Sequence, residues 1–234
     1  MLTRTLPVRD IRFATSRIRL ITLDVEETPF HFTAGQAVLV GLHGSPLRKP
    51  YSIASSPTEA AESRHIELLV QLDNNDALDP HLERAAAGTL VDVDGPIGTF
   101  GAVPPAGASP IMFVAGGTGI APLRSMLMER LAAAPPMTIS VVYSARSMDE
   151  LAYRLELEAL AAAGRIQVRF TLTRDSSGAW AGRQGRIDEA LLREALPSPD
   201  AQCFLCGPPS MVLDAAGHLR ALGVPQERIF TEAP

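Results

Sequence analysis

The 234-residue sequence has little cysteine, no long apolar run and no excess of positive charge. Its two cysteines, Cys203 and Cys206, are too few for a four-cysteine zinc or iron–sulfur site within this chain, so any cluster would belong to a partner. They lie in an apolar run typical of a strand, which places their α-carbons about 10 Å apart with side chains on opposite faces. That separation is too large for a disulfide, and we expect Cys203 to be a buried free thiol.

These absences also exclude several classes of protein. A formal net charge of −5 provides no basic field that would hold a nucleic-acid backbone. No apolar run is long enough to cross a bilayer, and the first residues, MLTRTLPVRDIRF, lack the apolar core of a secretory signal. With 46% hydrophobic and 20% charged residues, the composition is typical of a globular protein, which we expect to be cytoplasmic.

The first hundred residues contain no long amphipathic helix. Short β-like runs alternate with turn residues at 17–23, 37–42, 65–71 and 90–93. This pattern predicts a small antiparallel barrel or sandwich. The stretch richest in proline, glycine and alanine, GAVPPAGASP, follows at 101–110. We therefore place a domain boundary there, with one domain at 1–103 and a second at 104–234.

Beyond this boundary, apolar strands alternate with helices. Strands are expected at 111–115, 138–144, 166–173, 203–206 and 228–231, and helices at 122–134, 149–163, 188–196 and 209–222. In the helix at 149–163, Leu151, Leu155 and Leu160 recur near helical spacing and are expected to face the core. The alternation predicts a parallel, doubly wound α/β sheet.

A glycine-rich turn, FVAGGTGIAPLRSML, links the first of these strands to its helix. Gly117, Thr118 and Gly119 would let the backbone approach a pyrophosphate, which the positive end of the helix attracts. Pro122, in the first helical turn, occupies the place of the third glycine of the usual dinucleotide fingerprint. The turn alone is therefore weak evidence, and a tight turn without a ligand remains the alternative.

The residues after the second and third strands bear on the choice between NAD and NADP. After the second strand, no acidic residue that would accept a hydrogen bond from the ribose 2′-hydroxyl occurs before Asp149. Arg146, Thr173, Arg174 and Arg183 supply hydroxyl and guanidinium groups, which suit a 2′-phosphate. We expect NADPH, with NADH less favoured. The alternative is that these arginines are solvated surface residues.

Four motifs, in their order and spacing, resemble the ferredoxin–NADP reductase family of flavoproteins. They are RKPYSIASSP at 48–57, GPIGTF at 95–100, GGTGIAP at 116–122 and CGPPSM at 206–211. The resemblance covers nearly the whole chain. It implies a flavin-binding antiparallel β-barrel at 1–103, a Rossmann-like α/β NADP-binding domain at 104–234, and FAD as the flavin.

The resemblance also implies roles for individual residues. Tyr51 resembles the aromatic residue that stacks on the flavin, Ser52 the hydroxyl near flavin N5, and Arg48 or Lys49 the cation that faces the flavin phosphates. Cys206 resembles the cysteine beside the nicotinamide, where it would position the ring and not act as a nucleophile. Glu232 fits the acidic position near the C-terminus of plant-type members. The candidate catalytic residues implied by the resemblance are Ser52, Cys206 and Glu232. Further candidates for cofactor binding are Pro50, Ile53, Leu69 and Val70 for the flavin, and Gly207, Pro208 and Met211 for the nicotinamide.

The chain departs from the family pattern near both flavin phosphates. Lys49 holds the place of the usual arginine and Arg48 precedes it, so a shifted or shared phosphate contact is open. At 76–79 the residues are Asp76, Ala77, Leu78 and Asp79, where the family commonly has a glycine and a hydroxyl residue that contact the pyrophosphate. A carboxylate repels a phosphate, so the affinity for FAD and the choice of FAD over FMN stay open at this segment.

Three functions are compatible with this resemblance. The leading one passes hydride from NADPH to FAD and single electrons on to a ferredoxin, a flavodoxin or another iron–sulfur or flavin carrier. The basic residues Arg4, Arg9, Arg12, Arg17 and Arg19 would suit an acidic carrier, although a solvated strand face explains them as well. The second function is the reductase component of an oxygenase or a free-flavin reductase. The third is an electron-transfer or redox-sensing subunit that does not turn over pyridine nucleotide.

Overall fold

The computed structural model describes residues 3–28, 30–72, 82, 85–101, 109–133, 137–176 and 178–232. The chain forms two compact units, each described by itself below. The first unit consists of Met1–Val103 and Arg124–Ala133, and the second of Pro104–Leu123 and Ala134–Pro234. The expected boundary between residues 103 and 104 lies outside the described residues, as do the flavin-phosphate candidates at 76–79, so both stay predictions.

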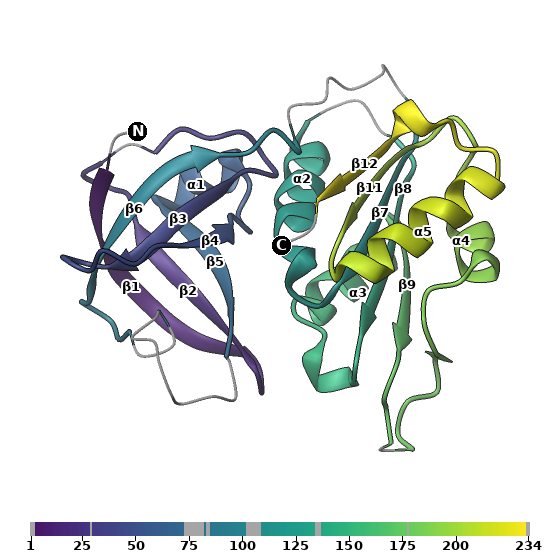
Figure 1. Ribbon diagram of the computed structural model, residues 1–234, viewed down its shortest axis with the longest axis horizontal. Coiled ribbons are helices and arrows are strands. Elements are labelled where there is room, and N and C mark those ends of the chain that lie inside the picture. Colours follow the sequence, from purple (N-terminus) through teal and green to yellow (C-terminus); the bar gives the residue numbers. More distant parts are fainter. Residues whose placement is uncertain are drawn as a thin grey trace. The chain divides into compact units, whose positions relative to one another are not determined.

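In its described residues, the first unit contains a six-stranded antiparallel sheet, a short helix and most of the helix α2 (Ile120–Ala132) (Figure 1). Its strands are β1 (Thr3–Thr15), β2 (Ile18–Asp24), β3 (Ala37–Leu42), β4 (Lys49–Ser52), β5 (His65–Gln71) and β6 (Leu90–Ile97), in the order β4-β3-β6-β1-β2-β5. A bridge between Ile53 and Leu68 joins the chain after β4 to β5, so that the two edges of the sheet meet and close it. The predicted antiparallel barrel is confirmed.

Alternation along the strands builds the core of the first unit. Val38 and Val40 of β3 and Leu68 and Val70 of β5 point into it and are almost fully buried. The helix α1 (Pro57–Ser63) follows β4 closely and begins with a capping box: Ser56 accepts from the Glu59 main-chain nitrogen, and the Glu59 carboxylate accepts from that of Ser56. These local contacts define where the chain turns after the RKPYSIASSP motif.

The second unit contains a parallel six-stranded sheet in the order β10-β9-β8-β7-β11-β12. Its strands are β7 (Ile111–Gly116), β8 (Ile139–Ala145), β9 (Gln167–Leu172), β10 (Arg183–Gln184), β11 (Gln202–Cys206) and β12 (Ile229–Glu232). The chain runs outward from β7 through β8 and β9, then crosses to β11 and β12, so a topological switch point lies between β7 and β11. The predicted parallel α/β sheet is confirmed.

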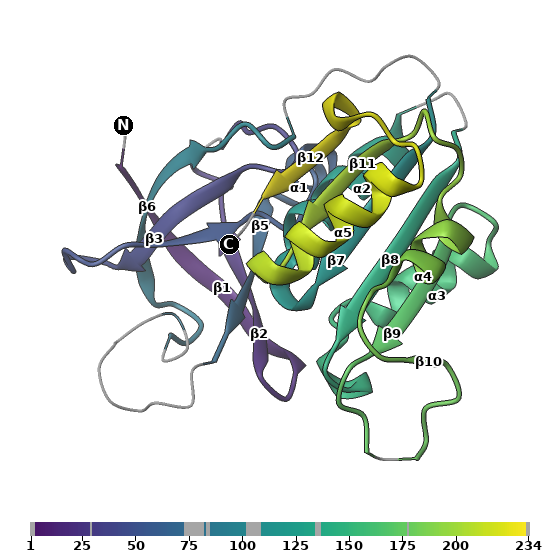
Figure 2. The same cartoon turned by 45° about the vertical axis from the view of Figure 1, so that its right-hand side comes forward.

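The helices of this part of the chain are α2 (Ile120–Ala132), α3 (Arg154–Ala162), α4 (Glu189–Ala195) and α5 (Pro209–Ala221). Figure 2 shows α4 and α5 on one face of the sheet, where their apolar residues share a core with β7 and β11. Cys203 belongs to this core and, like Cys206, is a buried free thiol, as predicted. Among the described residues, no helix is long and apolar enough to span a bilayer.

The helix expected at 149–163 begins later than predicted. Tyr153 has a left-handed backbone with φ of 57°, and α3 begins only at Arg154. Leu155 is 71% exposed, so the prediction that it faces the core is wrong. Leu157 is buried in its place. The helical spacing read from Leu151 does not continue through the break at Tyr153, because a left-handed residue changes the direction of the chain.

Candidate active site

Most candidate residues of the second unit lie at the carboxyl ends of its parallel strands. The 3-10 turn Gly117–Gly119 follows β7, Arg146 follows β8, Thr173 and Arg174 follow β9, Gly207 and Pro208 follow β11, and Glu232 ends β12. Because these ends meet at one edge of the sheet, the fold brings together residues that are far apart in the sequence. This edge, next to the switch point between β7 and β11, is where such sheets bind ligands.

Glycines let the turn after β7 pack against the end of β11. A Cβ atom on Gly119 would lie 2.3 Å from the main-chain oxygen of Cys206, and one on Gly116 would lie 2.5 Å from the sulfur of Met211. Gly207, with φ of 154°, would bring a Cβ atom within 2.9 Å of the Gly116 backbone. The GGTG and CGPPSM motifs are therefore in direct contact, and the contact requires residues without side chains.

At Gly117, the backbone conformation favours glycine, not a close contact. Its φ of 55° is left-handed, and in the described part of the chain no atom lies within 4 Å of a Cβ placed there. Tyr143 is fully buried and donates its hydroxyl to the Gly117 carbonyl oxygen at 3.0 Å. Burial raises the pKa of Tyr143, which keeps the hydroxyl a neutral donor. Space beside a fixed turn at the start of a helix fits the approach of a pyrophosphate.

Cys206 and Glu232 are paired in the register of β11 and β12, where both strands end. Cys206 is 1% exposed, and burial, with a smaller effect of the Glu232 charge, raises the pKa of its thiol to about 12. Burial also raises the pKa of Glu232. Among the described residues, Oε2 of Glu232 is buried without a hydrogen-bond partner. Buried polar atoms normally have partners, so this oxygen fits a site whose ligand completes it.

The ends of β8 and β9 are held together through the main chain. Thr173 donates its main-chain nitrogen to Ala145 at 2.9 Å, and Arg174 donates to the main-chain oxygen of Arg146 at 2.8 Å. The structure thus places the two exposed arginines at one corner of the sheet, together with the Thr173 hydroxyl. The two guanidinium groups are donors that suit a phosphate monoester, whereas the Thr173 hydroxyl donates to the main-chain oxygen of Ala145 at 3.3 Å.

Arg183, also predicted to contact the 2′-phosphate, has a protein partner. Its guanidinium lies 2.5 Å from the carboxylate of Asp188, the residue that caps α4. Its main-chain oxygen accepts the indole hydrogen of Trp180 at 2.8 Å. The Trp180 ring lies against Gly182, where a Cβ atom would be 2.5 Å away. This loop is organised by its own contacts.

In the first unit, β4 carries the residues that were predicted to bind the flavin. Alternation along this strand places Lys49 and Tyr51 on one face and Pro50 and Ser52 on the other. Tyr51 is half-buried and packs against the core, whereas Lys49 is exposed. An aromatic ring and a cation on one face of an edge strand fit a flat ring that carries a phosphate.

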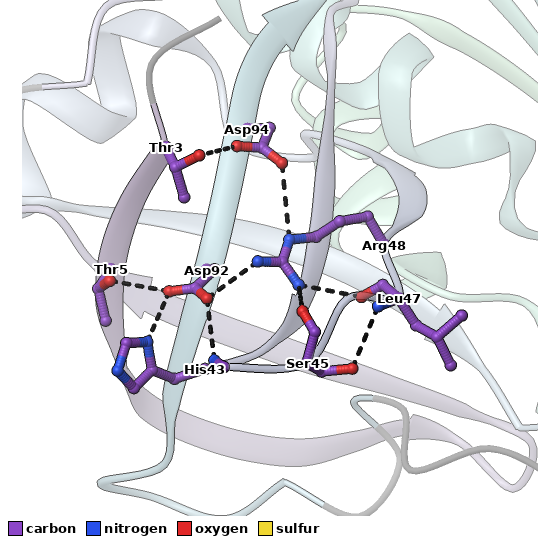
Figure 3. A network of polar contacts seen from close by, with 9 residues as sticks. Thr3, Thr5, His43, Ser45, Leu47, Arg48, Asp92 and Asp94 are labelled. Carbon is purple, nitrogen blue, oxygen red and sulfur yellow. Dashed lines mark hydrogen bonds and ion pairs between the residues drawn. The ribbon is translucent and has the colours of Figure 1, made fainter.

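Arg48 and Lys49 were the alternatives for the flavin phosphate, and their surroundings differ. The Arg48 guanidinium pairs with Asp92 at 2.9 Å and with Asp94 at 3.5 Å (Figure 3). These partners occupy the Arg48 guanidinium and make it less available to a phosphate. Asp92 was not singled out from the sequence, because an aspartate within a strand is indistinguishable from a solvent-facing residue until its neighbours are known.

Three other flavin candidates, Ile53, Leu69 and Val70, are buried residues. The side chains of Ile53 and Val70 belong to the core of the first unit. The side chains of Ile53 and Val70 are therefore occupied by core packing. Tyr143 was likewise not assigned a role from the sequence, since a tyrosine in an apolar strand is typical of core packing.

Comparisons with known proteins agree with this arrangement. Residues 7–101 match the family described as "Oxidoreductase FAD-binding domain", and residues 113–216 match the "Oxidoreductase NAD-binding domain". Ferredoxin–NADP reductase B of Sorangium cellulosum is 36% identical over 213 residues, which are 87% of this chain and 85% of that protein.

Two further relatives serve other systems. The reductase component of propane 2-monooxygenase from Rhodococcus jostii is 28% identical over 96% of this chain and 63% of its own length. The crystal structure of the Amycolatopsis cytochrome P450 reductase is 27% identical, with a TM-score of 0.84 over 99% of this chain and 71% of that one. These matches identify an FAD-dependent NAD(P)H oxidoreductase. The chain belongs to the ferredoxin–NADP reductase family of flavoprotein oxidoreductases.

Proposed function

We propose that this reductase takes electrons from NADPH and passes them singly to a ferredoxin or flavodoxin. The observation that carries this proposal is the 36% identity to a ferredoxin–NADP reductase across most of both chains. Bound FAD supplies the conversion between hydride transfer and single-electron transfer. The protein contributes binding, orientation and the placement of protons.

On the flavin side, we assign the stacking contact to Tyr51 and the phosphate contact to Lys49, since both lie on one face of β4. Ser52 is assigned to the reacting edge of the ring, where its half-buried hydroxyl would donate or accept a hydrogen bond. A Tyr51→Ala variant is expected to lose much of its affinity for flavin, because the aromatic face is removed.

On the nicotinamide side, we assign orientation to Cys206 and Glu232. The raised pKa of Cys206 keeps its thiol a neutral hydrogen-bond donor, and the unpartnered Oε2 of Glu232 offers a polar contact beside it. The turn Gly117–Gly119 is assigned to the pyrophosphate, because it combines open space with the start of α2.

The preference for NADPH rests on the corner formed by Arg146, Thr173 and Arg174. A charge-assisted hydrogen bond is worth about 1.5–3 kcal/mol, which is about a 10- to 150-fold difference in affinity. The Arg174→Ala variant should therefore raise the KM for NADPH at least about tenfold and leave the KM for NADH nearly unchanged.

Anaerobic stopped-flow reduction of the bound flavin by each nucleotide would test this assignment. Arg193→Ala is the matched control, since Arg193 is an exposed arginine on α4 that pairs with Glu189. An equal loss for both nucleotides in Arg174→Ala would remove the 2′-phosphate contact from the proposal. Failure of either nucleotide to bleach the flavin would favour the electron-transfer subunit that does not turn over.

For the carrier, we infer docking of an acidic protein on the surface of β1 and β2. Arg12 and Phe13 are both exposed there, with Phe13 at 67%, and the Arg19 guanidinium lies 5.3 Å from the centre of the Phe13 ring. An exposed arginine beside an exposed aromatic ring suits a negatively charged partner. Ferredoxin reduction should slow as the ionic strength rises, and a rate that does not respond would contradict docking by charge.

The reductase component of an oxygenase is the second candidate. The propane 2-monooxygenase reductase matches 96% of this chain, which favours a carrier within an oxygenase system. Steady-state rates with a ferredoxin, a flavodoxin and a free flavin as acceptors would separate the candidates. Retention of FAD through purification and turnover would argue against a free-flavin reductase.

A further inference from the structure

We propose that Arg48 is a positioning residue for the flavin site and does not itself contact the flavin phosphate. By binding Asp92 and Asp94 of β6, Arg48 holds the segment His43–Arg48 in place and thereby positions Lys49, Tyr51 and Ser52 of β4. This proposal rests on the assignment of the flavin to β4 made above. It concerns an arginine that sequence reasoning had kept as a candidate phosphate ligand.

The Arg48 guanidinium is surrounded by acceptors from its own unit (Figure 3). Nη2 donates to Oδ2 of Asp92 at 2.9 Å, and Nε lies 3.5 Å from Oδ2 of Asp94. Nη1 donates to the main-chain oxygens of Ser45 and Leu47. The Arg48 side chain is only 19% exposed. Nη1 and Nη2 therefore donate to protein acceptors, whereas Nε is buried, faces the Asp94 carboxylate and makes no hydrogen bond among the described residues. Little of the group is left exposed to an external anion.

Asp92 binds both ends of the segment His43–Arg48. Its Oδ1 accepts from Thr5 and from Nδ1 of His43, each at 2.8 Å. Its Oδ2 accepts from the main-chain nitrogen of Gly44 at 3.1 Å and from Arg48 at 2.9 Å. The first two residues of the segment and its last residue thus share one carboxylate. That carboxylate is held in place by the neighbouring strand β1, which supplies Thr5.

The contact between the segment His43–Arg48 and Gly41 of β3 is a second, independent observation. Gly41 of β3 is paired with Asp92 of β6. A Cβ atom on Gly41 would lie 2.0 Å from the main-chain oxygen of Leu47 and 2.9 Å from Nη1 of Arg48. The segment therefore lies directly on the backbone of β3, at a position where no side chain fits. Contacts this close restrict the direction in which β4 begins.

The charges around Arg48 argue against a phosphate at the same place. Two carboxylates face one guanidinium, so an approaching phosphate would meet a net negative charge. Moving Arg48 to the phosphate would leave the carboxylate of Asp92, which is 9% exposed, without its cation. Removing the partner of a buried charge is costly. Lys49, on the face of β4 that carries Tyr51, is the better-placed cation for a phosphate.

The position of β4 explains why such an anchor matters. β4 has four residues and lies at one edge of the sheet, where it pairs with β3. A short edge strand has few main-chain hydrogen bonds to hold it. Binding residues must be held to within about 0.5 Å to be effective. An ion pair at the residue immediately before the strand supplies this support.

A double-mutant cycle with Arg48→Met and Asp92→Asn tests the proposal. The full chain would be stripped of flavin and titrated with FAD and with riboflavin, which lacks phosphate, by fluorescence quenching. Each single variant should weaken both ligands by a similar factor, about tenfold, because the ring contacts of Tyr51 and Ser52 are disturbed. The double variant should be no weaker than either single variant, since both remove one interaction.

Two variants serve as controls. Arg193→Met removes an exposed ion pair with Glu189 of α4 and should leave both affinities unchanged. Arg48→Lys keeps the charge but loses the fork of the guanidinium, and should fall between the wild type and Arg48→Met. If Arg48→Met does not fold, the comparison of Arg48→Lys with Asp92→Asn provides the same test.

The result that would overturn the proposal is a loss confined to FAD in Arg48→Met, with riboflavin binding intact and Asp92→Asn unaffected. That pattern would make Arg48 a phosphate ligand. Unchanged affinities in both variants, alongside a clear loss in Tyr51→Ala, would also overturn it. If Tyr51→Ala itself binds both ligands normally, the assignment of the flavin to β4 fails, and the proposed site fails with it.

Discussion

Replacing Gly119 with alanine should separate the glycine turn after β7 from the end of β11. The added Cβ atom would lie 2.3 Å from the oxygen and 2.5 Å from the carbon of the Cys206 carbonyl group, and 2.7 Å from the Gly207 nitrogen. All three neighbours are backbone atoms, so no side-chain rotation relieves the overlap. Normal contacts between such atoms are about 3.5 Å, so the two segments must move apart by about 1 Å.

The cost of such overpacking is about 2–3 kcal/mol, which corresponds to a fall in Tm of about 4–12 °C for a chain of this size. Because Cys206 moves with its strand, the KM for NADPH should rise as well. Thermal unfolding and steady-state kinetics would measure both effects.

Gly217→Ala is the matched control for this change. Gly217 lies within α5, and the nearest atom to a Cβ placed there is 3.8 Å away. Alanine should raise stability at that position by about 0.5–1 kcal/mol, because it is a better helix former than glycine. A Gly119→Ala variant as stable as Gly217→Ala, with an unchanged KM, would refute the argument that the two motifs require this close approach.

Two further predictions concern charges in the first unit. The hydrogen bond from His43, followed by those from Thr5 and Gly44, lowers the pKa of Asp92 to about 2. The lowered pKa means that ionised Asp92 stabilises the fold by about 2 kcal/mol above pH 4, and that this stabilisation is lost as the pH falls toward 2. Urea unfolding from pH 6 to pH 2 should show this loss in the wild type and not in Asp92→Asn. Arg124 is buried and binds Glu59 at 3.0 Å, so Arg124→Met should lower the free energy of unfolding by about 3 kcal/mol. Removal of an exposed pair by Arg193→Met should lower it by less than about 1 kcal/mol. Equal losses in urea unfolding would contradict this difference.

Features with local causes were predictable from the sequence. The runs at 37–42 and 65–71 coincide with β3 and β5, because residues that alternate between core and surface show a period of two. The helix expected at 188–196 is α4, where Asp188 accepts from the main-chain nitrogen of Leu191 at 2.9 Å. That capping signal spans three residues, so it is visible without knowledge of the rest of the chain.

Features with distant causes were not predictable. The strand β1 was not assigned from the sequence, since most of its residues are exposed and only Leu6, Val8 and Thr15 are buried. Its place in the sheet comes from pairing with β2 on one side and β6 on the other. The exposure of Leu155 depends in the same way on the left-handed backbone of Tyr153, which the apolar spacing did not indicate.

The sequence by itself determined the two kinds of domain, the cofactors and the candidate residues on β4 and at the glycine turns. It could do so because the chemistry of these motifs lies in residue types at short spacing. Tertiary structure alone decided that carboxylates hold Arg48: Asp92 is 44 positions from Arg48 and reaches it only through the pairing of β3 with β6. Pairing between distant strands is decided by the packing of the whole sheet, which no short stretch of sequence encodes.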